Sequence, residues 1–445
     1  MYVVESLQKQ WYIGEKLIKI KVPKNVAYII GKLNESGYEA FAVGGCVRDA
    51  VLGLTPHDWD ITTSAKPEEV KAIFNRTIDT GIKHGTVTVM RDHIGYEITT
   101  YRIDGEYTDG RHPKEVVFTS NLIEDLKRRD FTINAMAYND EDGIIDEFGG
   151  VSDLENHIIR CVGVAEERFN EDALRILRAI RFAAKLDFSI EENTYAAIKK
   201  IAPNLSLISV ERIQSELTKL ITSDHPDRIK DIYRQGLSKY IFKESVLGDD
   251  EADIVPKDNK YSKEELFERV ANIMEALENS SYLRYAGLLT FENNPEKVLR
   301  NLKMDNKTIK IVSMLVNNRN YRLISDEGKI RRAIVDIGKD IFGEYYLPYR
   351  EGLILSQESD MDIEELNKIK CLYKKIIEEG QCVSMADMCI KGNDLKNLGV
   401  QDGKMIGEIL KYLFNEVIEY SELNDSETLI RLAKNKIDDL NVCHK

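Results

Sequence analysis

Hydrophobic and polar positions follow two different periods along the chain, and the change falls near residue 160. In residues 23–160, short alternating runs rich in β-forming residues are interleaved with helical segments, which predicts a mixed α/β region. From Ala165 onward the strand signals fade, and apolar residues recur at spacings of three and four, as in 171–186 and 210–222. The pattern therefore predicts an α/β (α+β) head with a mixed β-sheet, followed by all-α domains.

A glycine pair follows the first clearly β-forming stretch of the predicted head. Residues 38–43 are largely β-forming and 47–52 read as a helix, so Gly44 and Gly45 form a turn between a strand and a helix. Glycine lets backbone N–H groups come close to an anion and face it. The segment therefore predicts a phosphate-binding turn.

Two carboxylates come shortly after this turn. Asp58 and Asp60 are two residues apart, and a strand returns every second side chain to the same face, so both can point at one site. Two metal ions held by carboxylates suit in-line attack of a hydroxyl on a nucleoside triphosphate. A glycine pair or an Asp-x-Asp alone is common in turns and loops, but the two together predict nucleotidyl transfer.

Residues 44–65 also resemble the first motif of the class II tRNA nucleotidyltransferases, the CCA-adding enzymes of the polymerase β-like superfamily. The resemblance is strong over residues 38–220 and implies template-independent addition of the 3′-terminal CCA to tRNA from CTP and ATP. It further implies release of pyrophosphate, two Mg²⁺ ions on Asp58 and Asp60, and nucleotide contacts from Gly45 and Arg48. The implied domains are a nucleotidyltransferase head (1–160), a neck with the base template (161–222), a helical body (223–378) and a tail that binds the tRNA body (379–445).

A third carboxylate is expected near the aspartate pair, because metal ions need more ligands than two side chains supply. Glu97 is the candidate, in an alternating run at 95–102 that reads as a strand paired with 84–90 through a turn at 91–94. Tyr96, Ile98 and Thr100 share one face of that strand, so Glu97 lies on the other. An ordinary solvent-facing glutamate is the alternative, and the resemblance favours the catalytic role.

Two further segments carry weaker signals. Residues 103–115 are polar and glycine-rich between two strands, which predicts a mobile loop or, alternatively, a variable surface loop. In the family resembled, a flexible loop at this place is needed for the final A addition. Residues 146–154 resemble the family's third motif and are interpreted as a hinge element.

Residues 128–135 resemble the second family motif, which contacts the ribose and the triphosphate. The guanidinium of Arg129 can bind phosphate oxygens in bidentate fashion, while Asp130 or Asn134 can hydrogen-bond a 2′-hydroxyl. The alternative is a helix start at which Asp130 is the cap and Arg129 is solvated.

A basic helix predicted at 171–186 is the second most specific signal. Steps of three and four bring Asp172, Arg175 and Arg178 together on one face, with Arg181 only partly rotated away. The other side is covered by the apolar residues Leu174, Ile176, Leu177, Ile180 and Phe182. By itself this is an amphipathic helix in which Asp172 pairs with Arg175.

The resemblance gives this helix another role, in which Asp172 and Arg175 read the Watson–Crick edge of the incoming base and Arg178 and Arg181 contact the nucleotide or its phosphates. A carboxylate accepts a hydrogen bond from the exocyclic amino group that C and A both carry. U and G present a carbonyl there, and the mispaired contact costs roughly 1–3 kcal/mol.

Composition narrows the picture further. A chain of 445 residues is expected to form several domains, and a net charge of −14 disfavours a protein that grips nucleic acid over its whole surface, while a local basic groove remains possible. The six cysteines form no CxxC pair, which predicts reduced thiols and a cytoplasmic location. Neither a secretory start nor an apolar run near ~18 residues is evident, so membrane insertion is not expected.

Several alternatives stay open at this point. Bacterial poly(A) polymerases share the head motifs but carry a basic Gly-Arg-Arg-Phe-type segment where residues 80–86 read Thr-Gly-Ile-Lys-His-Gly-Thr. A partial enzyme that adds only CC or only A is a second alternative. A non-catalytic RNA-binding protein on the same scaffold is opposed by six intact residues: Asp58, Asp60, Glu97, Arg129, Asp172 and Arg175. An HD phosphohydrolase domain is not expected, because His225 is the one histidine of seven in the region where that domain would follow, and one histidine cannot build its metal site. The sequence does not indicate an oligomeric state.

Overall fold

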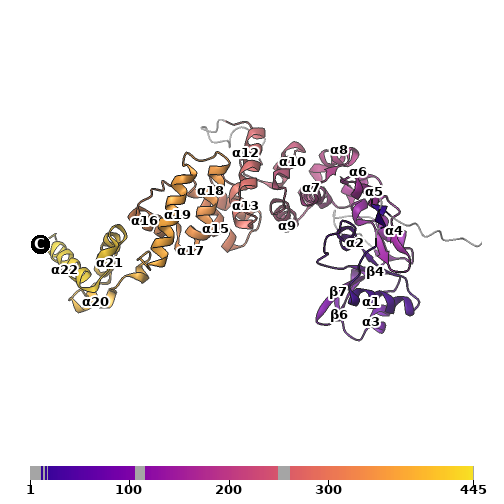
Figure 1. Cartoon of the computed structure of the whole chain (residues 1–445), viewed down its shortest axis with the longest axis horizontal. Helices are drawn as coiled ribbons and strands as arrows, with labels where there is room; N and C mark the ends of the chain where they lie inside the picture. The colour runs from indigo at the N-terminus through magenta and orange to yellow at the C-terminus, as the bar shows by residue number, and fades with distance from the viewer. Residues whose placement is uncertain (1–11, 14–15, 18, 106–115, 249–260, 444–445) are drawn as a thin grey trace, which may run out of the picture. The chain divides into compact units, whose positions relative to one another are not determined.

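The computed structural model describes residues 12–13, 16–17, 19–105, 116–248 and 261–443 (Figure 1). The chain forms two compact units. The first runs to Lys243 and includes Gly248, and the second holds Glu244–Leu247 and the described residues from 261 onward. Each unit has its own hydrophobic core.

A seven-stranded mixed sheet forms the centre of the head, as predicted. Its order is β11-β10-β3-β4-β7-β6-β5, and every neighbouring pair is antiparallel except β4 and β7, which are parallel. The strands are β3 (Ala40–Val43), β4 (Ile61–Thr63), β5 (Thr77–Gly81), β6 (Thr86–Arg91), β7 (Ile94–Thr100), β10 (Ala137–Asn139) and β11 (Gly143–Ile145). The parallel pair matters for the site, because Asp60 directly precedes β4 and Glu97 lies in the middle of β7.

Five helices and three two-stranded sheets accompany this sheet in the described part of the first unit. The helices are α1 (Lys24–Glu35), α2 (Gly45–Val51), α3 (Pro67–Ile73), α4 (Leu122–Lys127) and α5 (Gly150–Glu155). The small strands are β1 (Tyr12–Ile13) with β2 (Lys16–Leu17), β8 (Arg102–Asp104) with β9 (Val116–Phe118), and β12 (Ile158–Ile159) with β13 (Ser189–Ile190). Buried side chains of α1 fall at spacings of three and four, so its apolar stripe packs on the sheet.

Six helices complete the first unit. They are α6 (Ala165–Glu171), α7 (Leu174–Leu186), α8 (Glu192–Ile201), α9 (Val210–Ile221), α10 (Ile229–Arg234) and α11 (Ser238–Ile241). The prediction of one continuous helix over 171–186 was wrong at its start, because α6 ends at Glu171 and Asp172 is extended, with φ −146° and ψ 102°. The Asp172 carboxylate accepts a hydrogen bond from the Leu174 N–H at 3.1 Å, and such a local bond competes with helix continuation.

The described part of the second unit is helical throughout, which confirms the all-α prediction. Its helices are α12 (Lys263–Ala276), α13 (Ser281–Leu288), α14 (Pro295–Asn301), α15 (Asn306–Asn317), α16 (Glu327–Ile337), α17 (Lys339–Ile341), α18 (Leu347–Leu355), α19 (Ile363–Glu378), α20 (Gly392–Asn397), α21 (Gly403–Glu419) and α22 (Ser426–Cys443). Helices α21 and α22 pack on each other around Leu413, Val417 and Leu429. Within the described ranges, no helix is both long and apolar enough to cross a membrane.

The predicted division into head, neck, body and tail remains a prediction. The boundary between the two compact units falls at residues 243–251, of which 249–251 lie outside the described residues. Most of the predicted loop at 103–115 also lies outside them, because residues 106–115 are not described.

Candidate active site

The aspartate pair lies in the extended residues that lead into β4, not inside a strand as predicted. The strand begins at Ile61, because β3 has only a few residues to pair with it. The Asp60 carbonyl still accepts the Val43 N–H at 3.0 Å, so the hydrogen-bonding pattern between β3 and β4 extends one residue further. The backbone at Asp60 is therefore fixed by the sheet, although the residue precedes the strand.

The register of the parallel strands brings Glu97 to the aspartates. Ile61 pairs with Ile98, which places Asp60, just before β4, beside Glu97 of β7, each one residue earlier than the paired residues. Glu97 lies on the exposed face of β7, while Tyr96, Ile98 and Thr100 are buried on the other, as predicted. A cavity of about 500 Å³ is lined by all three carboxylates, together with His57, Trp59 and neighbouring residues.

The electrostatics of this cavity favour a cation. The pKa of Asp60 is raised, chiefly by desolvation and further by the negative charges of Glu97 and Asp58, while the positive charge of Arg129 opposes the shift. Three carboxylates that repel one another around one cavity are the donor set that Mg²⁺ prefers. Among the described residues, no three His, Cys, Asp or Glu side chains are placed so that they could hold a metal ion as they stand.

The glycine pair forms a turn next to this cavity. Gly44 has a φ of 81° and precedes α2, whose Arg48 N–H donates to the Gly44 carbonyl at 3.1 Å. A Cβ atom on Gly44 would lie 2.8 Å from Nη1 of Arg129 and 3.6 Å from the Asn134 carbonyl oxygen. Glycine is therefore required twice here, for its backbone conformation and for the guanidinium that lies against it.

Arg48 is held inside the head. It is 3% exposed, and it donates to the Asp49 carboxylate at 2.8 Å and to the side-chain oxygen of Asn134 at 2.6 Å. Asn134 donates in turn to Asp130 at 3.1 Å. The predicted nucleotide contacts of Arg48 and Gly45 stay predictions, because the structure engages the Arg48 guanidinium with side chains of the head.

Asp130 connects this network to the basic helix. One of its oxygens accepts two hydrogen bonds from Arg178, at 2.8 and 2.6 Å. Burial raises the pKa of Asp130, but Arg178, the Asn134 hydrogen bond and Arg175 outweigh it and lower the pKa to about 2. Asp130 is thus an ionised carboxylate of the second motif that binds α7 through Arg178.

Arg181 is likewise engaged by a buried carboxylate. It donates to Glu216 of α9 at 2.5 Å, and Glu216 also lies 3.9 Å from Arg178. The guanidiniums of Arg48, Arg178 and Arg181 surround the Phe182 ring at 5.0, 5.4 and 3.9 Å from its centroid. Three guanidiniums can lie this close together because the negative face of the ring and the carboxylates of Asp130 and Glu216 stabilise their positive charges. The structure therefore joins α2, α7 and α9 at this ring.

The two predicted template residues have separate partners. Asp172 forms an ion pair with Arg212 of α9, at 3.2 and 2.7 Å, and does not pair with Arg175. Arg175 is 9% exposed and donates to Glu171 at 2.7 Å and to the backbone carbonyls of Arg128 and Arg168 at 3.0 and 3.2 Å. The break between α6 and α7 turns Asp172 toward α9, so the two side chains do not form the expected i,i+3 pair.

Three domain families match the chain in order along its length. They are the Poly A polymerase head domain over residues 40–160, the RNA and SrmB-binding site of polymerase A over 187–246, and the tRNA nucleotidyltransferase domain 2 over 282–433. The CCA-adding enzyme of Ligilactobacillus salivarius is 38% identical over 94% of this chain and 97% of its own. That of Enterococcus faecalis is 38% identical over 92% and 95%. The chain belongs to the CCA-adding enzymes.

Solved structures agree with this assignment. The crystal structure of the Bacillus stearothermophilus CCA-adding enzyme in complex with CTP is 30% identical, has a TM-score of 0.76, and covers 95% of this chain and 100% of that one. The Thermotoga maritima CCA-adding enzyme complexed with tRNA shares the fold, at 20% identity and a TM-score of 0.61 over 94% and 97%. Family membership confirms the prediction of a tRNA nucleotidyltransferase that adds CCA to tRNA and, as in this family, uses a divalent metal.

The sequence predicted a helix over 210–222, but it did not identify Arg212 and Glu216 as partners of the predicted site residues. They are four residues apart on α9, so they share a face, and that spacing is the only local signal. Their partners lie 40 and 35 residues away in the sequence. A contact of that range depends on how α7 and α9 pack.

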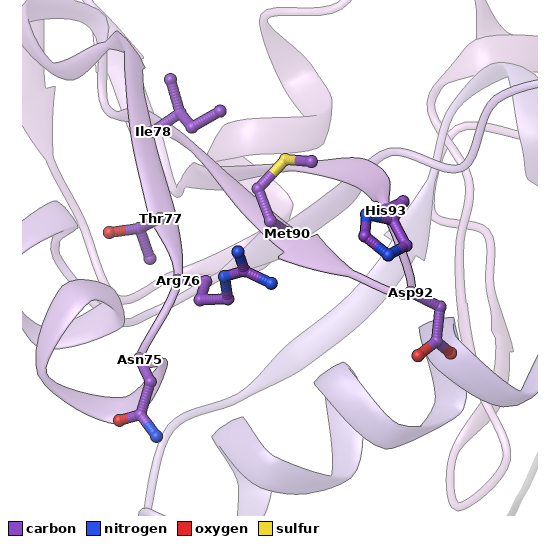
Figure 2. A pocket seen from close by; sticks show the side chains of 7 residues that line it. All are labelled: Asn75, Arg76, Thr77, Ile78, Met90, Asp92 and His93. Carbon is purple, nitrogen blue, oxygen red and sulfur yellow. The ribbon is translucent and has the colours of Figure 1, made fainter.

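The head of this CCA-adding enzyme has a second cavity, of about 520 Å³, that none of the site carboxylates lines. Figure 2 shows it between β5 and the turn that joins β6 to β7, with Arg76 and Met90 in the middle and Asp92 and His93 at the turn. Asp92 and His93 have φ values of 50° and 63°, as a two-residue hairpin turn requires. The cavity is separate from the chemistry, and no function is assigned to it.

Proposed function

We propose that Asp58, Asp60 and Glu97 bind two Mg²⁺ ions and that this site joins the 3′-hydroxyl of tRNA to the α-phosphate of CTP or ATP. The observation that carries the proposal is the convergence of these carboxylates on one cavity. A bound divalent metal lowers the pKa of an attacking hydroxyl and stabilises leaving pyrophosphate.

The triphosphate is proposed to lie between this cavity and the Gly-Gly turn. Arg129 supports this placement, because its guanidinium lies against Gly44 and its charge lowers the pKa of Asp60. The Nε atom of Arg129 is buried and has no acceptor among the described residues, so a donor remains for an anionic ligand. A phosphate oxygen is a chemically matched acceptor for it.

Base selection is proposed for Asp172 and Arg175, beside the second motif. Asp172 keeps acceptor capacity beyond its Arg212 pair, because a carboxylate has about four lone-pair sites. Arg175 donates to the carbonyl of Arg128, which ties the template to the residue next to Arg129. Arg178 and Arg181 are proposed to support the nucleotide through Asp130 and Glu216, from the neck side.

The substrates are proposed to be tRNA lacking its 3′ end, CTP and ATP, with complete CCA as the product. The CTP complex of the Bacillus stearothermophilus relative supports CTP as a substrate of this chain. The cytoplasmic location expected from reduced cysteines stays a prediction, supported by the five free cysteines among the described residues.

The metal assignment is tested with Asp58→Ala and Asp60→Ala, measured against Asp79→Ala, which alters an exposed carboxylate of the same head. Incorporation should be lost in the first two variants over the whole range of Mg²⁺ concentrations. Affinity for tRNA, measured by filter binding, should stay within about twofold of the parent, because the metals act on the triphosphate. Retained turnover in either variant would show that the metals bind elsewhere.

A further inference from the structure

Asp125, in α4, has a buried carboxylate that is not among the residues proposed to bind metal or nucleotide. It is 0% exposed and lies three and four residues before Arg128 and Arg129. Burying a carboxylate is costly unless it is paired and hydrogen-bonded. Burial raises the pKa of Asp125, but the charges of Arg128 and Arg129 and hydrogen bonds from the Arg128 side chain and the Arg102 N–H outweigh it and hold the pKa below its usual value.

The two oxygens of Asp125 hold two consecutive arginines in different ways. Oδ1 accepts from Nε and Nη2 of Arg128 at 3.0 and 2.8 Å, while Oδ2 accepts from Nη2 of Arg129 at 3.4 Å. The other terminal nitrogen of Arg129, Nη1, is the atom that lies against Gly44. Asp125 therefore fixes one edge of the guanidinium whose other edge faces the glycine turn.

The same carboxylate is bonded to the strands that carry the site. The Thr62 hydroxyl lies 3.3 Å from Oδ2 of Asp125 and 3.2 Å from the Thr99 carbonyl oxygen. Thr62 follows Asp60 by two residues on β4, and Thr99 follows Glu97 by two residues on β7. The N–H of Arg102 also donates to Oδ1, at 3.3 Å. Through these contacts, Asp125 connects β4 and β7, next to the cavity lined by the three carboxylates, with Arg128 and Arg129.

We propose that Asp125 is a positioning residue for nucleotidyl transfer, which holds the Arg129 guanidinium at a fixed place relative to Asp60 and Glu97. The inference rests on the proposed role of Arg129 at the triphosphate and deepens it. Of the two arginines that Asp125 holds, Arg129 is the one whose Nη1 lies against Gly44 and whose charge acts on Asp60. The backbone carbonyl of Arg128 accepts a hydrogen bond from Arg175. Asp125 is therefore linked, through Arg128, to one of the residues proposed to read the base.

The test compares Asp125→Asn with Asp231→Asn. Asp231 is a matched control, since it is buried in α10 of the same compact unit, accepts a hydrogen bond from the Tyr195 hydroxyl at 3.3 Å, and lies outside the motifs of the head. Asp125→Asn should raise KM for both CTP and ATP by about tenfold or more, because a misplaced guanidinium contacts the triphosphate poorly. Asp231→Asn should change neither KM by more than about twofold, even if both variants lose similar thermal stability.

Further variants separate this inference from the proposed function. If Arg129→Ala leaves KM for nucleotides unchanged, the role of Arg129 is wrong. If Arg129→Ala raises KM while Asp125→Asn behaves like Asp231→Asn, Arg129 keeps its role and the positioning inference is wrong. In the double variant, Asp125→Asn should add little to the KM effect of Arg129→Ala, because both remove the same contact.

Should Asp125→Asn fail to fold, Thr62→Val gives the measurement, because it removes a single hydrogen bond to Asp125. A rise of about threefold in KM with kcat little changed would support the inference. An unchanged KM in a folded Thr62→Val enzyme would overturn it.

Discussion

Arg212 of α9 donates to both carboxylate oxygens of Asp172, which lies extended between α6 and α7. The pair joins the residue proposed to read the base with a helix that is 40 positions further along the chain. Both groups are partly shielded from solvent, with side-chain exposures of 22% and 15%, so water and salt screen their attraction less than that of a fully exposed ion pair.

Base choice should be lost when the template pair is removed. Asp172→Ala with Arg175→Ala should reduce discrimination of CTP and ATP over UTP and GTP by about tenfold or more, because each mispaired contact is worth roughly 1–3 kcal/mol. Single-nucleotide kinetics on a truncated tRNA measure this, with Lys199→Ala, on the exposed side of α8, as the control. A double variant that discriminates as well as the parent would place the template elsewhere.

Gly44 should tolerate no side chain, and Gly53 provides a matched control. Both have positive φ values, 81° and 74°, but a Cβ would meet Arg129 only at Gly44, and nothing lies within 4 Å of it at Gly53. Gly53→Ala should cost about 1 kcal/mol of stability from backbone strain alone, with activity intact. Gly44→Ala should show the same strain and additionally raise KM for nucleotides, because Arg129 must move. Equal activity in the two variants would remove Arg129 from the site.

Acid should lower the free energy of unfolding of the enzyme, because Asp130 becomes protonated. Its pKa is about 2 in the folded protein against 3.8 as the ordinary value, so the folded state binds that proton less tightly than the unfolded chain. The resulting stabilisation of about 2 kcal/mol is present in full above pH ~4 and is lost as the pH falls toward 2. Chemical denaturation at several pH values should show a flatter acid limb for Asp130→Asn than for the parent. An unchanged acid limb would mean that Asp130 contributes nothing to it.

Local patterns predicted the head well. The turn at 91–94, the buried face of Tyr96, Ile98 and Thr100, and the exposed position of Glu97 follow from alternation within a single hairpin. The glycine turn and the change to helices after the head likewise depend on residues that are close in the sequence, so both could be predicted from the sequence alone.

Contacts between distant elements could not be predicted in this way. Nothing in the periodicity of α7 shows that Asp172 leaves the helix, since a single hydrogen bond to the Leu174 N–H decides it. The engagement of Arg181 by Glu216 and of Arg129 by Asp125 depends on packing that buries the carboxylates. Burial turns arginines that look solvated in the sequence into fixed parts of a network.

The products of the reaction test the central claim most directly. The parent enzyme is incubated with Mg²⁺ and tRNA lacking its 3′ CCA, with each of the four nucleotides singly and with CTP and ATP together, and product length is measured by gel at single-nucleotide resolution. The account predicts two residues added with CTP alone, three with CTP and ATP, and none with UTP or GTP. Long A tails from ATP alone, or equal incorporation of UTP, would contradict it.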